Sequence, residues 1–174
     1  NQDPGRGFLI AGRLVHHKGI DVGYSAWKRA DTDQPLRIAG LGPAIQHLPE
    51  AEALGWLSEA ELHAEMRAAR ALIFPSRWQE PYGIIGVEAL AQGTPVIAMQ
   101  RGGMGDWMET GCIKIQPGDV EGMAAAIKTL ARHPSLALKL GQAGQAMMRH
   151  RQRTQRSTQI IADLYEKTRR LAGT

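Results

Sequence analysis

Short apolar runs recur along the chain, and the segments between them carry apolar residues at a helical period. The runs are too short for typical helices and several contain β-branched or aromatic residues, so they are predicted to be buried strands. Five strands are predicted, together with a candidate sixth at Ala53–Leu57: Phe8–Ala11, Leu36–Leu41 (interrupted by Arg37), Ala71–Phe74, Pro95–Met99 and Cys112–Ile115.

Helical patterns lie between the predicted strands, at Ile20–Ala30, Ser58–Ala69, 83–92 and 119–132. Ser58 with Glu61 three positions later is a capping-box pattern, and Asp119 is predicted to cap the last of these helices. Parallel strands need crossover connections, and those helices cover both faces of the sheet. The alternation therefore predicts a Rossmann-like, doubly wound parallel α/β sheet of about six strands.

The strand pattern stops at Ser135. Two closing helices are predicted from there, separated by Gln152–Thr154, on two apolar sets: Leu136, Leu138, Leu140 and Ala143, then Ile160, Ile161, Leu164 and Tyr165. We find no internal repeat. Residues 1–174 are interpreted as one domain, in which 135–174 form the closing C-terminal helices.

Composition narrows the cellular setting. The 174 residues suit one domain, and the single cysteine, Cys112, excludes an internal disulfide. No leader pattern is evident and no apolar run approaches the roughly 18 residues that span a bilayer, so a cytoplasmic protein is expected.

The net charge of +4 is modest, but basic residues gather near the end: Arg149, Arg151, Arg153, Arg156, Lys167, Arg169 and Arg170. This basic C-terminal face is either a solvated helix surface, a contact with the inner face of an anionic membrane, or a contact with a partner domain. Nucleic acid is not an expected partner, because no binding motif with interleaved aromatic residues accompanies the arginines.

Ligands of open parallel sheets bind outside the carboxyl ends of the strands, so functional motifs are expected just after strands. Gly12–Gly19, Gly40–Pro43 and Ser76–Gly83 occupy such positions. The second lacks the third glycine of a dinucleotide-binding fingerprint, because Ile45 stands there, and no Gly-Lys-Ser/Thr sequence is present. A Rossmann dehydrogenase and a P-loop enzyme are therefore disfavoured.

Arg13 and Lys18 bracket the loop that ends at Gly19, so their two cations could converge on one anionic group. The helix predicted to start near Gly83 adds unpaired backbone N–H groups and a partial positive charge, which suit a diphosphate. Gly86, like Gly83, leaves room for close approach. The alternative is structural: glycines that only shape turns, and an arginine in a surface ion pair.

Glu80 lies before that helix, and Glu88 lies about 7–8 Å further along its axis at 1.5 Å per residue. Carboxylates accept hydrogen bonds from hydroxyls, so one suits the ribose of a nucleotide and the other a transferred sugar. Two solvated glutamates are the alternative for an isolated pair. The adjacent His16 and His17 are more often incidental than metal ligands, and no metal site is predicted.

Together these residues resemble the C-terminal, donor-binding domain of retaining glycosyltransferases of the GT-B fold, especially family 4. The resemblance covers nearly the whole chain, through ordered motifs: Gly-Arg-Leu-x-x-x-Lys-Gly at 12–19, Gly-x-Gly-Pro at 40–43, Gly-Trp-Leu-Ser at 55–58, Phe-Pro-Ser at 74–76, Glu-Pro-Tyr-Gly at 80–83, Glu-Ala-Leu-Ala-x-Gly-x-Pro-Val-Ile-Ala at 88–98, Gly-Gly at 102–103 and Pro-Gly-Asp at 117–119. Asp106 departs from the glutamate usual in Gly-Gly-x-x-Glu, and the segment at 110–112 is shorter than is common.

The resemblance implies a metal-independent hexosyltransferase without a cofactor. The motifs specify neither the base nor the sugar of the donor, and UDP- or GDP-linked sugars are expected ahead of ADP-linked ones. Its implied catalytic residues are Arg13 and Lys18 on the diphosphate and Glu80 on the sugar. The implied donor site is Gly12, Arg13, Lys18, Trp56, Leu57, Glu80, Tyr82, Gly83, Ile84, Ile85 and Glu88. Within it, Trp56 and Leu57 contact the nucleobase, backbone amides at 83–85 contact the phosphates, and Glu88 contacts the ribose. Front-side substitution, with the β-phosphate taking the acceptor proton, is the implied mechanism.

The resemblance also implies an N-terminal acceptor domain that this chain does not carry. Weak donor binding and little transfer are therefore expected of the isolated domain, whose last helix offers apolar surface to that domain or to a dimer partner. Trp78 either stacks on a sugar or braces its loop. A non-catalytic nucleotide- or protein-binding module is the alternative function, and a glycoside hydrolase would leave the phosphate-oriented loops without a purpose.

Overall fold

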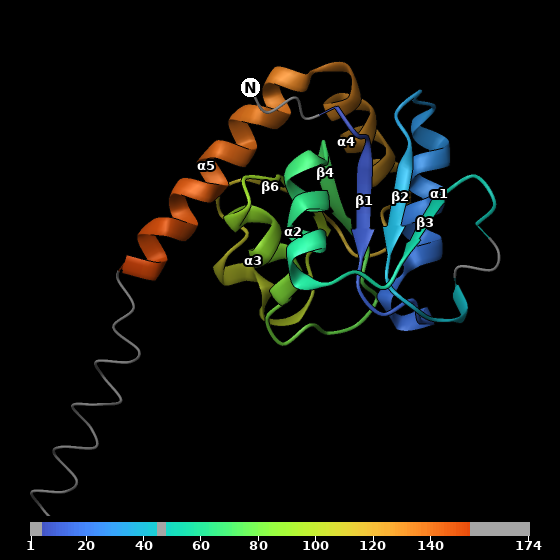
Figure 1. Ribbon diagram of the computed structural model, residues 1–174, viewed down its shortest axis with the longest axis horizontal. Helices are drawn as coiled ribbons and strands as arrows, with labels where there is room; N and C mark the ends of the chain where they lie inside the picture. The colour runs from blue at the N-terminus through green and yellow to red at the C-terminus, as the bar shows by residue number, and fades with distance from the viewer. Residues whose placement is uncertain (1–4, 45–47, 154–174) are drawn as a thin grey trace, which may run out of the picture.

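The computed structural model describes residues 5–44 and 48–153. Its centre is a six-stranded sheet with the order β3-β2-β1-β4-β5-β6, in which every neighbouring pair is parallel (Figure 1). The strands are β1 (Phe8–Ala11), β2 (Leu36–Ala39), β3 (Glu52–Gly55), β4 (Ala71–Phe74), β5 (Val96–Met99) and β6 (Cys112–Ile115). The predicted doubly wound α/β fold is confirmed.

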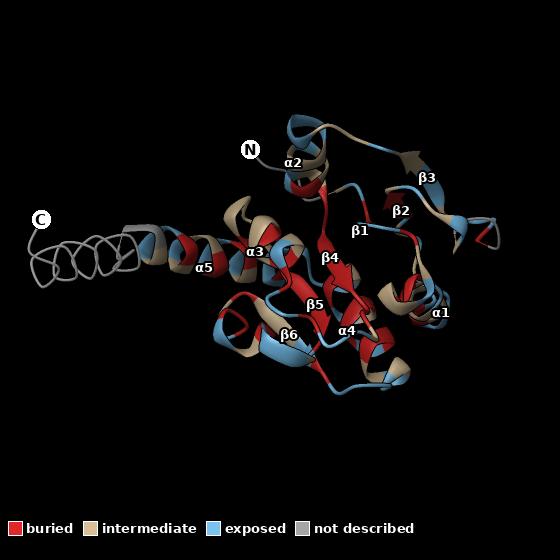
Figure 2. Cartoon of the chain, turned by 90° about the horizontal axis from the view of Figure 1, so that it is seen from below, coloured by how far each residue is buried: buried red, intermediate tan, exposed pale blue. Residues whose placement is uncertain are grey.

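Helices cover both faces of the sheet. On one face lie α1 (Ile20–Ala30) and α4 (Val120–Arg132), and on the other lie α2 (Glu59–Ala68) and α3 (Ile84–Ala91), which Figure 1 shows in front of the strands. Successive strand residues point to opposite faces, so Phe8 and Ile10 join the core under α1 and α4 while Leu9 joins the other core. The central strands β4 and β5 are buried throughout, as Figure 2 shows.

Two element boundaries differ from prediction in ways that shape the site. The second strand ends at Ala39 rather than Leu41, because Gly40 adopts a φ of +136° that turns the chain away from the sheet. The candidate sixth strand exists, but it ends at Gly55 (φ +70°) rather than Leu57. Trp56 therefore stands outside the sheet and is 71% exposed.

The predicted helix starts are confirmed at two positions. Ser58 and Glu61 form the reciprocal capping box of α2, in which each side chain bonds to the backbone of the other. Asp119 accepts a 2.7 Å hydrogen bond from the N–H of Gly122 at the start of α4. Both caps satisfy backbone donors that have no partner within the helix.

The last described helix, α5 (Pro134–Arg153), runs through Gln152 and Arg153, so the break predicted at Gln152–Thr154 does not begin there. Thr154 and the second closing helix lie outside the described residues. The inward face of α5 is also different from prediction, since Leu136 and Ala143 are exposed. Its buried positions are Ala137, Gly141, Gly144 and Met148.

Two glycines explain why this face of α5 is turned toward the core. A Cβ on Gly141 would lie 2.0 Å from the carbonyl oxygen of Gly93, and one on Gly144 would lie 2.6 Å from a methyl of Leu90. The backbone of α5 therefore packs closely against α3 and the loop that follows it, and the helix then projects to one side of the fold (Figure 2). Within residues 5–44 and 48–153, none of the helices is both long enough and apolar enough for a bilayer crossing.

Candidate functional site

A cavity of about 350 Å³ opens at the carboxyl ends of β1 and β4. It is lined by Ala11, Gly12, Arg13, Lys18, Phe74, Glu80, Pro81, Tyr82, Gly83, Ile84 and Ile85. This is the edge at which parallel α/β sheets bind ligands. Eight of the residues that the resemblance assigned to a donor site are brought together here: Gly12, Arg13, Lys18, Glu80, Tyr82, Gly83, Ile84 and Ile85.

A second cavity of about 320 Å³ continues from the first toward the end of β2. The two share Ala11, Gly12, Arg13 and Ile85, and the second adds Ala39, Gly40, Leu41, Trp56, Leu57 and Leu62. The walls of both cavities are mostly apolar and Arg13 lines both, whereas Lys18 and Glu80 line only the first. The pair offers an elongated ligand Lys18 and Glu80 at one end and Trp56 and Leu57 at the other.

The loops after β1 and β2 meet backbone to backbone between these cavities. A Cβ on Gly40 would lie 1.8 Å from the carbonyl oxygen of Gly12, so only glycine allows this approach. The N–H of Leu14 donates to the carbonyl of Leu41 at 2.9 Å, which ties the two loops together next to Arg13. The backbone of Arg13 is thereby placed at the rim, while its side chain is exposed.

Lys18 and Glu80 contact each other directly in the lining of the first cavity. The Nζ of Lys18 donates to Oε1 of Glu80 at 2.6 Å, and the hydroxyl of Ser76 donates to the same oxygen at 2.6 Å. Glu80 is only 5% exposed, and such a buried carboxylate requires partners of this kind. The resemblance assigned the two residues to different parts of a ligand, whereas in this structure they also bind each other.

That pairing leaves binding capacity on both residues. An ammonium carries three N–H donors and a carboxylate has about four acceptor positions, so neither is saturated by the shared hydrogen bond. Lys18 sits at the end of the short 3-10 helix η1 (His16–Lys18), which Gly19 closes with a φ of +67°. The ion pair holds the ammonium at the cavity wall.

Ser76 belongs to the Phe-Pro-Ser motif and begins a loop that the sequence identified, but no role was predicted for it. It is fully buried, and its hydroxyl also lies 3.4 Å from the carbonyl of His17. The available signal was its position directly after the buried strand β4, where polar side chains face the ligand edge. Its partner Glu80 lies four positions on in the same loop, and the pairing of the two was not predicted.

The start of α3 forms another wall of the first cavity. Gly83 precedes the helix with a φ of +76°, and no side chain among the described residues caps that end. The first turn carries no acidic residue, so the partial positive charge of the helix start is left uncompensated by a carboxylate from that turn. This end is suited to an anion.

Trp107 supports this helix start from below. The fully buried indole donates its N–H to the carbonyl of Tyr82, and a Cβ on Gly86 would lie 2.3 Å from the ring. The indole ring therefore fixes the path of the chain into α3, and it sets how closely the first turn of α3 packs on the ring. Sequence reasoning missed Trp107, because its contacts join segments far apart in the chain.

The Gly-Gly pair after β5 supports the loop that carries Glu80. These glycines begin the 3-10 helix η3 (Gly102–Asp106), and the N–H of Gly103 donates to the carbonyl of Glu80 at 2.8 Å. A Cβ on Gly102 would lie 2.3 Å from that carbonyl oxygen, which excludes larger residues.

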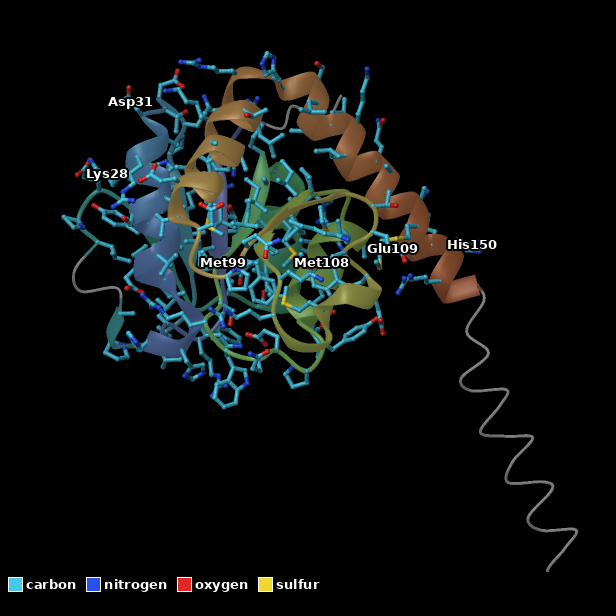
Figure 3. The ribbon with its side chains drawn as sticks, turned by 180° about the vertical axis from the view of Figure 1, so that it is seen from behind. Lys28, Asp31, Met99, Met108, Glu109 and His150 are labelled. Carbon is cyan, nitrogen blue, oxygen red and sulfur yellow. The ribbon has the colours of Figure 1, made fainter. Side chains whose placement is uncertain are left out.

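Asp106 ends η3 and is exposed outside both cavities. Its carbonyl accepts a hydrogen bond from Arg151 of α5, whose guanidinium also lies 4.0 Å from the carboxylate of Glu109. Figure 3 shows Glu109 next to the last turns of α5, close to His150. These contacts attach the end of α5 to the segment that follows η3.

Two other residues that the sequence singled out lie outside the cavities. Glu88 is half-buried in α3 and lines neither of the two cavities described, so its role toward a ribose stays a prediction. Trp78 also lies outside both linings and contacts the ring of His17, with centroids 5.5 Å apart. Among the described residues, no three of His, Cys, Asp and Glu gather as a metal site.

The glycosyl transferases group 1 family matches residues 2–147, which is most of the chain. The chain belongs to the group 1 glycosyltransferases. Glycogen synthase of Mycobacterium tuberculosis is 33% identical over 151 residues, which cover 78% of this chain and 36% of the relative. The lipopolysaccharide core biosynthesis glycosyltransferase LpsD of Rhizobium meliloti is 27% identical over 181 residues and is covered to 51%.

Solved glycosyltransferase structures share the fold of this group 1 domain. Sucrose-phosphate synthase of Thermosynechococcus elongatus superimposes with a TM-score of 0.82 at 23% identity, over 98% of this chain and 47% of that chain. HepE of Anabaena superimposes with a TM-score of 0.79 at 21% identity, over 94% of this chain and 49% of that chain. The chain thus matches one half of a GT-B glycosyltransferase and spans about half or less of these proteins.

Proposed function

We propose that this chain is the donor-binding half of a retaining glycosyltransferase, and that it binds a nucleoside-diphosphate sugar for hexosyl transfer to an acceptor held mainly by another domain. The observation that carries the proposal is the first cavity, in which Arg13, the Lys18–Glu80 pair and the uncapped start of α3 line one space. Two cations and a helix start favour a diphosphate there.

The two cavities match the two ends of a nucleotide sugar. The diphosphate and sugar fit the first cavity, where Lys18 can keep Glu80 and still donate to a phosphate oxygen. The base fits the second cavity, next to Trp56 and Leu57. HepE of Anabaena has been crystallised with UDP and with UDP-glucose, which supports a UDP-linked donor for this chain. UDP and GDP sugars are preferred over ADP sugars in this proposal.

The proposed chemistry is stabilisation of a departing nucleoside diphosphate. As the bond between sugar and phosphate lengthens, negative charge grows on the bridging oxygen, and the cations attract this charge more strongly than that of the resting donor. Glu80 accepts hydrogen bonds from sugar hydroxyls and holds Lys18 in place. Transfer with retention, without a metal ion, would proceed by front-side attack, with the β-phosphate taking the acceptor proton.

Titration calorimetry with UDP, GDP and ADP tests this proposal. We expect UDP or GDP to bind weakly and Arg13→Ala to reduce the affinity about tenfold, because a charge-assisted contact to phosphate is lost. Arg132→Ala is the matched control, because Arg132 is an exposed arginine at the last residue of α4, outside both cavities. The affinity of this variant for the nucleotide should match that of the wild-type protein. Absence of binding by all three nucleotides would instead favour the non-catalytic module.

A further inference from the structure

We propose that Arg77 and Asp21 form a positioning fork that sets the relative placement of Lys18 and Glu80. This inference rests on the proposed donor-binding function and assigns to it two residues that lie outside both cavities. Arg77 is in the loop after β4 that also carries Glu80. Asp21 is in the first turn of α1, directly after the loop that carries Lys18.

The fork is bidentate. Nη1 of Arg77 lies 2.6 Å from Oδ1 of Asp21, and Nη2 lies 2.7 Å from Oδ2. Two parallel hydrogen bonds of this kind fix the orientation of the guanidinium as well as its distance. The hydrogen bond from Arg77 also lowers the pKa of the Asp21 carboxyl, and the same bond raises the pKa of Arg77.

Arg77 makes further contacts with the loop after β1. Its guanidinium donates to the carbonyl of His16 at 3.1 Å, and its backbone N–H donates to the carbonyl of His17 at 2.9 Å. Lys18 is the next residue in the chain. One residue of the Glu80 loop therefore holds the backbone that delivers the ammonium of Lys18 to the cavity.

The same two loops meet again inside the site. There the hydrogen bond of Lys18 to Glu80 joins them, and the hydroxyl of Ser76 donates to Glu80 and lies 3.4 Å from the carbonyl of His17. The fork is the outer attachment of this pair of loops, and the Lys18–Glu80 bond is the inner one. Arg77 and Asp21 lie outside both cavities, so a ligand bound there does not compete for the outer attachment, which keeps the loops in register while Lys18 and Glu80 also bond the ligand.

The side chains of Arg77 and Asp21 are 33% and 56% exposed, and ion pairs so exposed add little to global stability. The fork therefore affects the relative placement of Lys18 and Glu80 more than it affects the free energy of unfolding. The alternative is that Arg77 serves ligand binding only through its positive charge, with Asp21 as an incidental neighbour.

The substitution Asp21→Asn separates these explanations by sign. It removes a negative charge and keeps the arginine, so a purely electrostatic role predicts unchanged or tighter binding of an anion. A positioning role predicts weaker binding, because the amide cannot accept both hydrogen bonds of the fork. We expect the affinity of the protein for UDP or GDP, measured by calorimetry, to fall about fivefold in Asp21→Asn.

A double-mutant cycle with Arg77→Ala completes the test. In the Arg77→Ala background we expect Asp21→Asn to change the affinity by less than about twofold, since the fork is already absent. Arg77→Lys keeps the charge but not the fork geometry, and should fall between wild type and Arg77→Ala. The matched control is Glu121→Gln, which removes another exposed ion pair of α1, the one between Arg29 and Glu121 at 2.6 Å, and should leave binding unchanged.

Hydrogen exchange of the ligand-free protein gives a readout that does not depend on nucleotide. We expect the amide of Arg77 to exchange about fivefold faster in Asp21→Asn, while the amide of Gly122, held by the side chain of Asp119, is unchanged. A general loss of stability would accelerate both amides.

Wild-type or tighter nucleotide binding by Asp21→Asn, or unaltered exchange at Arg77, would overturn the inference. If wild-type protein binds neither UDP nor GDP, the proposed function fails, and exchange at Arg77 still decides whether the fork joins the loops.

Discussion

The ammonium of Lys18 lies 2.6 Å from the carboxylate of Glu80, although 62 positions separate the two residues in the chain. Each residue belongs to a loop at the carboxyl end of a neighbouring strand, β1 or β4, so the sheet order brings them together. The contact places a cation and a hydroxyl acceptor in one cavity. Most of the chemistry proposed for this domain depends on that pair.

Glu80→Gln should separate sugar recognition from phosphate recognition. The amide removes a negative charge next to Lys18 and leaves the ammonium partly unpaired, so we expect a loss of about 1–3 kcal/mol in the free energy of unfolding. UDP affinity should be kept or increased, whereas the extra affinity of UDP-glucose over UDP should disappear. Calorimetry with both ligands and denaturant titration measure these effects; retained preference for UDP-glucose would remove Glu80 from the sugar site.

Glu88→Gln tests the predicted ribose contact. Wild-type protein should bind UDP more tightly than 2′-deoxy-UDP, by about 1 kcal/mol for one hydrogen bond. The substitution should reduce that difference, because an amide is a weaker acceptor for a hydroxyl than a carboxylate. An equal difference in both proteins would exclude a ribose contact by Glu88, which lines neither of the described cavities.

Gly86→Ala tests the support that Trp107 gives to α3. The added methyl group would lie 2.3 Å from the indole ring, so helix or ring must move, and we expect a loss of about 1–3 kcal/mol in the free energy of unfolding. Gly105→Ala is the control, because its Cβ would meet only the side chain of Gln100, at 3.8 Å. Thermal unfolding of both variants provides the comparison. Equal stability would show that the ring is free to move.

Cys112 should be an unreactive thiol. Burial raises its pKa from the ordinary 9.0 to about 12, so at pH 8 the reactive thiolate is rare in the folded protein. A colorimetric thiol reagent should label it slowly unless denaturant is present. The pKa of the thiol is higher in the folded protein than in the unfolded one. The contribution of the buried neutral thiol to the free energy of unfolding is therefore complete below pH 9.0 and is lost as the pH rises toward 12. Fast labelling at pH 8 without denaturant would contradict this.

Local sequence pattern was sufficient for most of the secondary structure. The run Ala71–Phe74 and the helix Ile20–Ala30 appear in the structure with the predicted bounds, because a buried parallel strand leaves a continuous apolar run and an amphipathic helix leaves a periodic apolar pattern. The break predicted at Gln152 failed because the continuation of α5 depends on its contacts with α3 and with the η3 segment. Such contacts leave no local periodicity.

The candidate site divides in the same way. Arg13, Lys18, Glu80 and Gly83 were identifiable because each lies in a loop directly after a strand or before a helix, and such loops meet at the ligand edge of any parallel sheet. Trp107 and the Arg77–Asp21 fork were not identifiable, since their partners come from segments far apart in the chain. Ser76 lies in a loop that the sequence did identify, but its bond to Glu80 depends on how that loop folds.

The sequence by itself determined the alternation of strands and helices, and with it the edge of the sheet that carries the cavities. Only the tertiary structure decided that Lys18 pairs with Glu80, that Arg77 pairs with Asp21, and that Trp107 lies under the start of α3. The physical reason is the distance along the chain over which each kind of interaction acts. Strand and helix signals arise from neighbouring residues, whereas hydrogen bonds between loops depend on sheet order and on which side chains the packed core leaves within about 3 Å of each other.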